Sequence, residues 1–288
     1  MANHRTPSPR RTAPSTERRT RPRTDDSGWR TAITRIQPNE ILIRGYAVDE
    51  LMGRLSFAEA IYLILRGELP TPTMGKLFGA VLVASIDHGV TPPSTLAARN
   101  VATSGARIRA CVAAGVLGFG MYHGGDVETC MRFLEDGLAR VRDVGESHAE
   151  SADALIRGFL DAGRPLPGFG HRLHSTDPRA SRLLQMAHEL ELDGEHVQFV
   201  RAIERRLEGK TQGGHPIPLN IDGAIAAVCA DMGFEPELGN ALFMIARIPG
   251  LVAHAHEERV RQHPMRQIDP KDASYDGPPP RRLPETRK

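Results

Sequence analysis

The sequence has few aromatic residues and few cysteines, which argues against a small secreted scaffold. Aromatic residues make up 5% of the 288 residues, with one tryptophan. The three cysteines, Cys111, Cys130 and Cys229, are odd in number, far apart and set in apolar runs. Disulfide frameworks use even numbers of cysteines, and zinc sites use closely spaced ligand pairs. We therefore expect buried free thiols in a reducing compartment, the cytoplasm.

The chain also lacks an uninterrupted apolar run of the roughly 18 residues that a membrane span needs. Its net charge is only +2, and no basic stripe follows residues 1–28, so neither a membrane nor a nucleic acid is an expected partner. Residues 1–28 hold seven arginines among proline, serine and threonine, with almost no large apolar residue. Such a segment cannot offset its ordering entropy by burial, and we expect a disordered basic tail.

That tail also differs from targeting sequences. No apolar segment follows the arginines, as it would in a secretory signal. A mitochondrial presequence is likewise rich in arginine and serine, but the prolines here would spoil its amphipathic helix.

Helical periodicity dominates what is present. Ser56 and Glu59 form a capping-box pair before an apolar run, and Gly67 is a stop signal. The only strand-like stretch is Glu40 to Tyr46, so strands and helices do not alternate, and an all-α fold is expected. Further helices are predicted over 73–88, from Ser94, and over 107–120, 126–142, 148–162, 178–190, 195–208, 221–232 and 236–262.

Two loops carry a histidine beside glycines. His123 precedes Gly124 and Gly125, and His171 follows Gly170, so a ligand can approach the backbone at both places. Each loop alone is also compatible with an ordinary turn. Near the second loop, Asp177-Pro178 predicts a capped helix start. Arg179 would then lie at the positive end of that helix, where an anion is favoured, or simply on its surface.

Two charged residues stand in apolar surroundings. Asp222 precedes a run of apolar residues and is either a helix N-cap or a base whose pKa is set by burial. Arg247 has apolar residues on both sides and therefore needs a partner, which a ligand carboxylate would supply. His254 and His256 are two positions apart on a predicted helix and do not face each other, so we predict no metal site.

In this order, the segments resemble the citrate synthase family. The resemblance covers about residues 30 to 268, and it is the ordered set that makes it specific. It is carried by 43–46, 56–63, 66–70, 87–89, 93–94, 123–125, 168–171, 177–179, 220–222 and 246–247.

The resemblance implies a mostly helical homodimer with shared active sites. It implies a large domain of residues 29–129 and 223–266 and a small domain, 130–222, that closes over the ligands. Residues 267–288 are expected to form a loose C-terminal tail.

The resemblance also implies a set of functional residues. His123, His171 and Asp222 match the catalytic positions. Other matches, for the keto acid, are His88, Arg179, Arg247 and Arg266, the last reaching the partner's site. The loop of Leu166, Pro167, Gly168, Phe169 and Gly170 is expected to bind coenzyme A, which acts as a co-substrate because no permanently bound cofactor is implied.

The implied activity is Claisen chemistry between acetyl-CoA and oxaloacetate, run as a citrate synthase or in reverse as a citryl-CoA lyase. Alternatives are a methylcitrate-type synthase acting on another acyl-CoA and a ligand-binding homologue without turnover. The chain departs from the family's usual pattern at Asp126, at His174 and in the tighter spacing from His171 to Arg179. These departures, with the short chain, point toward the lyase.

Overall fold

The computed structural model describes residues 28–120, 123–124, 126–171 and 175–283. Helices dominate this part of the chain, which confirms the all-α prediction. The predicted basic tail, except Gly28, lies outside the described residues, as does His174. The helices are α1 (Val48–Leu51), α2 (Phe57–Arg66), α3 (Pro72–Ala84), α4 (Pro93–Thr103), α5 (Ile108–Leu117), α6 (Asp126–Val144), α7 (His148–Asp161), α8 (Pro178–Glu189), α9 (Glu195–Leu207), α10 (Ile221–Asp231) and α11 (Pro236–Arg261).

The prediction of a single strand from Glu40 to Tyr46 was wrong. The chain reverses at Arg44 and Gly45, which both have positive φ, and the stretch forms β2 (Glu40–Ile43) and β3 (Tyr46–Ala47). With β1 (Thr34–Gln37) they make an antiparallel sheet in the order β1-β2-β3. A two-stranded hairpin of β4 (Thr211–Gln212) and β5 (His215–Pro216) lies elsewhere in the chain.

Local signals set most helix boundaries. Ser56 and Glu59 make the predicted capping box at the start of α2, and Gly67 ends that helix with a φ of 85°. Helix α3 ends at Ala84, four residues before the predicted end at 88. The early end leaves residues 85–92 as a loop in front of α4, and this loop carries His88.

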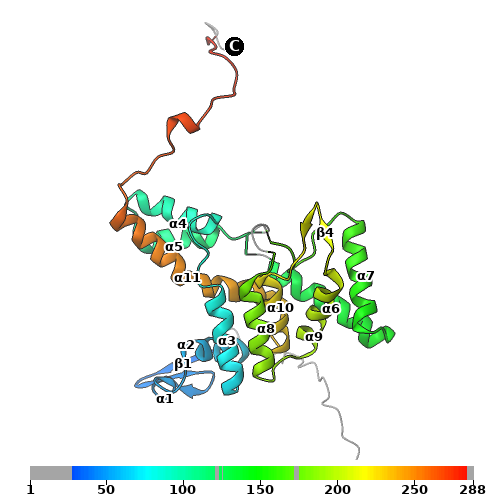
Figure 1. Cartoon of the computed structure of the whole chain (residues 1–288). Coiled ribbons are helices and arrows are strands. Elements are labelled where there is room, and N and C mark those ends of the chain that lie inside the picture. Colours follow the sequence, from blue (N-terminus) through cyan, green and yellow to red (C-terminus); the bar gives the residue numbers. More distant parts are fainter. Residues whose placement is uncertain (1–27, 121–122, 125, 172–174, 284–288) are drawn as a thin grey trace, which may run out of the picture.

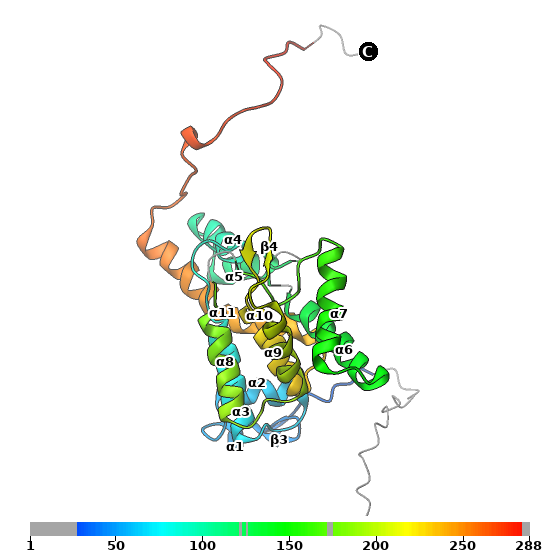
Figure 2. The same ribbon diagram turned by 45° about the vertical axis from the view of Figure 1, so that its right-hand side comes forward.

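Helix α10 lies at the centre of the fold, with other helices on either side of it. Figure 1 shows α4, α5 and the second half of α11 on one side, and α6 and α7 on the other, an arrangement that Figure 2 repeats from a second angle. Helix α10 contacts α6, α8 and α9, and residues 223–229 of it are all buried. The three cysteines are free and buried, as predicted. The division into a large and a small domain stays a prediction.

Helix α11 is the one described helix that is long and apolar enough to cross a membrane, judged by length and composition. Of its most apolar 18-residue window, 44% is buried inside the protein. It packs against α4, α5 and α6, and the buried side chains of Leu242, Arg247 and Leu251 follow its length. Helix α11 is therefore a core helix of this fold.

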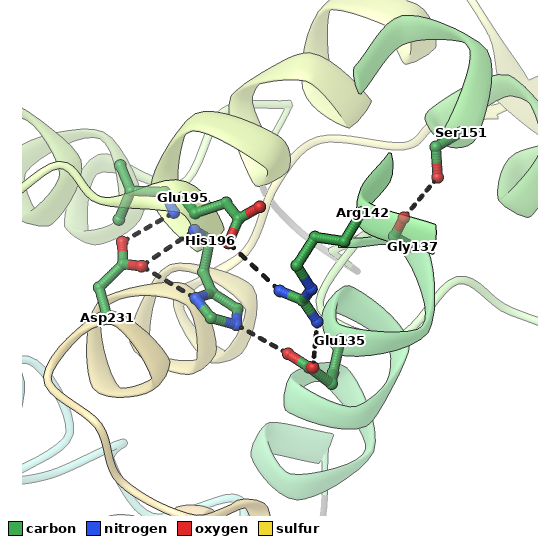
Figure 3. A network of polar contacts seen from close by, with 8 residues as sticks. Glu135, Gly137, Arg142, Ser151, Glu195, His196 and Asp231 are labelled. Carbon is green, nitrogen blue, oxygen red and sulfur yellow. Dashed lines mark hydrogen bonds and ion pairs between the residues drawn. The ribbon is translucent and has the colours of Figure 1, made fainter. Parts of the chain in front are cut away.

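A polar network fastens the start of α9 to α6 and α10 (Figure 3). The carboxylate of Asp231, at the end of α10, accepts hydrogen bonds from the backbone N–H groups of His196 and Val197 at 2.9 and 3.0 Å. It thereby caps α9, which has no side-chain cap of its own. The His196 ring bridges Asp231, 2.9 Å from Nδ1, and Glu135 of α6, 3.2 Å from Nε2.

The chain leaves the helical body after α11. In both ribbon views residues 267–283 run away from the rest of the protein, and all of them are exposed. One 3-10 turn, η1 (Pro270–Asp272), interrupts this segment.

Candidate active site

Six of the seven side chains expected to be catalytic or to bind the keto acid share one electrostatic environment. His88 is influenced by the charges of Arg247, Arg179 and His171. His123 is influenced by Arg247 and His88, and Asp222 by Arg179 and Arg247. These residues come from three loops, from the first turns of α8 and α10, and from the middle of α11. The fold therefore brings together positions spread over 160 residues.

His123 is held between a hydroxyl and an aromatic ring. Its Nε2 lies 2.7 Å from Oγ of Ser94, a fully buried residue in the first turn of α4. Its ring stacks on Phe119, with centroids 5.0 Å apart. Burial lowers the pKa of His123, and the charge of Arg247 adds to this effect. A neutral His123 whose Nε2 accepts from Ser94 presents Nδ1–H as a donor.

His88 stands in the loop that the early end of α3 creates. The loop rests directly on α11 because Gly250 has no side chain: a Cβ there would lie 2.5 Å from the Ile86 carbonyl oxygen. The neighbouring Asp87 accepts a hydrogen bond from its own loop at Gly89 N, 3.0 Å, and its Oδ1 lies 3.0 Å from His254 Nε2 of α11. His254 thus fixes the loop that presents His88. Among the described residues, no cluster of three or more potential metal ligands occurs.

Asp222 does not cap α10, so that alternative is excluded. Asn220 is the N-cap, and its Oδ1 accepts from Gly223 N at 3.1 Å. Asp222 lies inside the first turn, half-buried, and its buried Oδ1 has no hydrogen-bond partner. Burial and the nearby Asp126 raise the pKa of Asp222 to about 6. A carboxylate with that pKa can both take and give a proton near neutral pH.

Arg247 is a buried cation with unused hydrogen-bonding capacity. The residue is 1% exposed, and its Nε donates to the carbonyl oxygen of Ser85 at 2.8 Å. Its guanidinium lies over the Phe243 ring, 4.8 Å from the centroid, while the buried Nη1 has no partner. A buried donor without an acceptor is costly, and a ligand carboxylate would satisfy it.

Arg179 is paired within the chain. Asp177, completely buried, caps α8 by accepting from Arg179 N at 3.0 Å, and it also binds the guanidinium at Nε and Nη2, 3.1 and 2.8 Å away. The same carboxylate accepts from Ile221 N at 3.1 Å, next to Asp222. Asp177 therefore fixes Arg179 and the backbone next to Asp222 relative to each other.

The loop 166–170 lies against the segment that precedes α10, at Pro218 and Asn220. Leu166, Pro167, Gly168 and Phe169 are buried, and Gly170 is half-buried. Gly170 N donates to Pro218 O at 2.7 Å, and Asn220 Nδ2 donates to Gly170 O at 3.0 Å. His171 follows directly. The expected coenzyme A segment therefore adjoins two catalytic positions, His171 and Asp222 at the start of α10.

Arg266 is the one expected residue outside this group. Its Nε lies 2.9 Å from Oε1 of Glu258, whose Oε2 accepts from Arg99 Nε at 2.6 Å. Glu258 is 1% exposed, whereas the Arg266 side chain is 45% exposed. Arg266 therefore lies where α11 meets α4, past the last turn of α11.

Sequence reasoning missed several of the supporting residues. Ser94 was expected only to open a helix, and nothing in the sequence joins it to His123, 29 positions away. The contact of Asp177 with Ile221 spans 44 positions. Asn220 and Asp222 are both of types favoured at N-caps, so residue type alone could not tell which of them caps α10.

Comparison with known proteins decides the family. The family description "Citrate synthase, C-terminal domain" matches residues 70–268, more than half of the chain. The chain belongs to the citrate synthase family. Citrate synthase 2 of Bacillus subtilis is 31% identical over 224 residues, which are 77% of this chain and 56% of that protein. The chain thus spans about half the length of the curated relatives it matches.

Solved structures of this family share the fold. Citryl-CoA lyase from Hydrogenobacter thermophilus superposes with a TM-score of 0.80 at 44% identity, covering 89% of this chain and 98% of that one. Citrate synthase from Thermoplasma acidophilum, solved with carboxymethyl coenzyme A and oxaloacetate, has a TM-score of 0.64 at 21% identity and covers 80% of this chain and 59% of that one. The second likeness shows the fold alone. Both support the prediction of a mostly helical citrate synthase fold.

Proposed function

We propose that the protein is a citryl-CoA lyase that cleaves citryl-CoA to acetyl-CoA and oxaloacetate. The observation that carries this proposal is the likeness to the Hydrogenobacter thermophilus lyase, with 44% identity and a TM-score of 0.80. The curated citrate synthase 2 of Bacillus subtilis is 31% identical. The site supplies residues suited to carbon–carbon bond cleavage.

The arginines bind the carboxylates of the keto-acid half. Arg247 offers the free Nη1 in a buried setting, where a charge-assisted hydrogen bond is strong. Arg179 exchanges part of its pairing with Asp177 for a ligand carboxylate. His88, influenced by both arginines and by His171, completes the binding group.

In the proposed cleavage, His171 and Asp222 each transfer a proton, and His123 donates a hydrogen bond. His171 removes the hydroxyl proton of citryl-CoA, the carbon–carbon bond breaks, and oxaloacetate forms. The electrons pass to the thioester, whose enolate oxygen accepts a hydrogen bond from neutral His123, oriented by Ser94. Asp222 then gives its proton to the enolate carbon, which yields acetyl-CoA. Run in reverse, the same three residues carry out condensation.

Coenzyme A enters as part of the substrate, and the proposal requires no resident cofactor or metal. The loop 166–170 is proposed to bind it, since this loop adjoins both His171 and the start of α10. The cytoplasmic location also stays a prediction.

A second copy of the chain is the proposed partner. An apolar hollow of about 650 Å³ opens on α11 and is lined by Ile245, Ile248, Val252 and neighbouring residues. Leu117 of α5 and Val260 of α11 are exposed as well, 86% and 63%. Burying such surface between two copies is favourable. Arg266, which lies outside the group of six in its own chain, would then serve the site of the partner.

The shared site can be tested by complementation. Arg266→Ala and His123→Ala chains are each expected to be inactive as homodimers and to regain part of the activity when mixed under conditions of chain exchange. Light scattering measures the molar mass in solution and so tests whether the chain forms a dimer. Absence of rescue despite proven exchange would contradict the sharing of sites.

The activity is tested by supplying citryl-CoA and measuring oxaloacetate release, and by supplying acetyl-CoA and oxaloacetate and measuring free coenzyme A. The lyase proposal expects rapid oxaloacetate release and little free coenzyme A. The opposite result identifies a synthase, and propionyl-CoA in place of acetyl-CoA tests the methylcitrate type. Binding of oxaloacetate and coenzyme A without turnover in either assay would indicate a non-catalytic homologue.

A further inference from the structure

We propose that Asp126 is a positioning residue, which ties the loop 166–170 to the start of α10 and places a second carboxylate within electrostatic range of Asp222. Asp126 is the first residue of α6 and is half-buried. The role in turnover rests on the proposed function, while the tie from Asp126 through Gly168 to the start of α10 stands on the contacts themselves.

The tie is a charge-assisted hydrogen bond. Oδ2 of Asp126 accepts from the backbone N–H of Gly168 at 2.9 Å. Gly168 O in turn accepts from Asn220 N at 3.0 Å, directly before α10. The peptide groups of Gly168 therefore connect α6 to α10 through a carboxylate on one side and a backbone amide on the other. An ionised acceptor makes such a bond about twice as strong as a neutral one.

Glycine is required on both sides of the contact between the loop 166–170 and α10. Gly168 has a φ of 78°, and a Cβ there would lie 2.6 Å from both Cys130 Sγ and Gly223 Cα. A Cβ on Gly223 would lie 2.4 Å from Gly168 O. The loop therefore touches the backbone of α10 at the residue next to Asp222. A shift of the loop would move both the proposed coenzyme A segment and the turn that carries the base.

The second carboxylate changes the charge balance around Asp222. Burial is the main reason that the pKa of Asp222 rises to about 6, and Asp126 contributes next. Arg179 of α8 and Arg247 of α11 act in the opposite direction, while Asp177 adds to the rise. Cys130 of α6 adds no third negative charge, because burial and the two carboxylates raise the pKa of its thiol and keep it protonated.

The first test needs no substrate. Melting temperatures at pH 8 are measured for wild type, Asp126→Asn, Asp222→Asn and the double variant. Removing the ionised Asp222 is expected to stabilise the protein, and this gain is expected to be smaller once Asp126 is neutral, because coupled residues are not additive. Equal gains in both backgrounds overturn the proposal.

Two further variants keep this test decisive. Asp126→Ser supplies an uncharged acceptor if the Asn variant does not fold. Asp136→Asn removes the same charge from an exposed position of α6 and is expected to leave the gain at Asp222 unchanged. A loss of coupling in the Asp136 variant as well would contradict a specific role for Asp126.

The second test uses turnover. In Asp126→Asn the pH profile of kcat/KM is expected to move to lower pH by roughly half a unit, since a like charge no longer opposes ionisation of Asp222. Asp126→Ala, which also loses the acceptor for Gly168 N, is expected to raise KM for the coenzyme A ester about tenfold, and Asn to restore most of it. An unshifted profile overturns the charge role in turnover. Coupling without turnover of any substrate refutes the lyase proposal and supports the pairing.

Discussion

Asn220 caps helix α10, and this leaves Asp222, two positions later, with a buried oxygen that accepts no hydrogen bond. The helix does not depend on the Asp222 side chain for its start. The position of that carboxylate, half-buried and beside Asp126, is unfavourable for stability once it is ionised. Protein stability and proposed catalysis therefore make opposite demands on one residue.

Replacing Asp222 by Asn is expected to abolish turnover and to stabilise the protein at high pH. The pKa of Asp222 is about 6 in the folded state against 3.8 for a free carboxyl, so the folded protein binds this proton more tightly. The stabilising contribution of the protonated form is complete below about pH 4 and is lost as the pH rises through 6. At pH 8 the variant should be more stable by about 1–3 kcal/mol.

Thermal unfolding from pH 4 to pH 8 measures this difference. The melting temperatures of wild type and variant should agree below about pH 4, separate between pH 4 and 6, and differ by a constant amount above that range. A variant less stable than wild type at pH 8 would show that Asp222 makes a favourable contact as a carboxylate. Retention of near wild-type turnover would refute its role as the proton donor and acceptor.

Arg247→Met is expected to remove keto-acid binding while leaving stability near or above that of the wild type. Methionine fills similar apolar space and removes a buried cation whose Nη1 has no partner. The loss of the proposed charge-assisted hydrogen bond should weaken oxaloacetate binding about 100-fold or more. Calorimetric titration with oxaloacetate measures it. Arg66→Met is the matched control, since Arg66 also lies over an aromatic ring, that of Phe234, outside the site.

Local chemistry made the helices predictable, whereas contacts between distant segments were not. Ser56 and Glu59 act three residues apart, so the start of α2 could be read from the sequence. The reversal at Arg44 was missed because positive φ at a residue other than glycine leaves little signal in a sequence. The end of α3 was misplaced because Ser85 and His88 belong to a loop that Gly250 of α11 accommodates.

In the candidate active site, too, local motifs carry a signal in the sequence and long-range contacts do not. Its histidines, Asp222 and arginines could be proposed from the sequence because the segments that carry them resemble the family in the same order. Their supports are long-range: Ser94 meets His123, and Asp177 meets Ile221. Such pairs depend on how helices pack, and spacing along the chain does not encode them. Burial also depends on how the helices pack, so the raised pKa of Asp222 could not be predicted from the sequence.

Glu258→Gln is expected to destabilise the protein by about 3–5 kcal/mol, because it leaves the buried Arg99 without its charge partner. Glu258 is 1% exposed and also lies against Arg266. The neighbouring Glu257→Gln is the control: its ion pair with Arg261 is largely exposed and should contribute at most about 1 kcal/mol. Urea unfolding of both variants gives the comparison. Equal effects would mean that the buried pair contributes no more than a surface pair.

His196 should make the stability of the α6–α9–α10 junction depend on pH. Burial alone lowers the pKa of His196, but the hydrogen bonds and charges of Asp231 and Glu135 outweigh it, and the pKa is raised above 6.5 (Figure 3). Arg142 and Glu195, which pair with each other nearby, complete the charged surroundings. Because the folded-state pKa is the higher one, the contribution is complete below pH 6.5 and is lost as the pH rises through the folded value.

His196→Gln is therefore expected to lower the free energy of unfolding by about 1–2 kcal/mol at pH 5.5, the magnitude of a charge-assisted hydrogen bond. The deficit should shrink by pH 9, where the wild-type imidazole is neutral too. His188→Gln is the matched control, since His188 pairs with Asp193 but its side chain is 74% exposed. Urea unfolding at the two pH values measures both variants. A deficit at His196 that does not change with pH would show that the ring acts by packing and not by its charge.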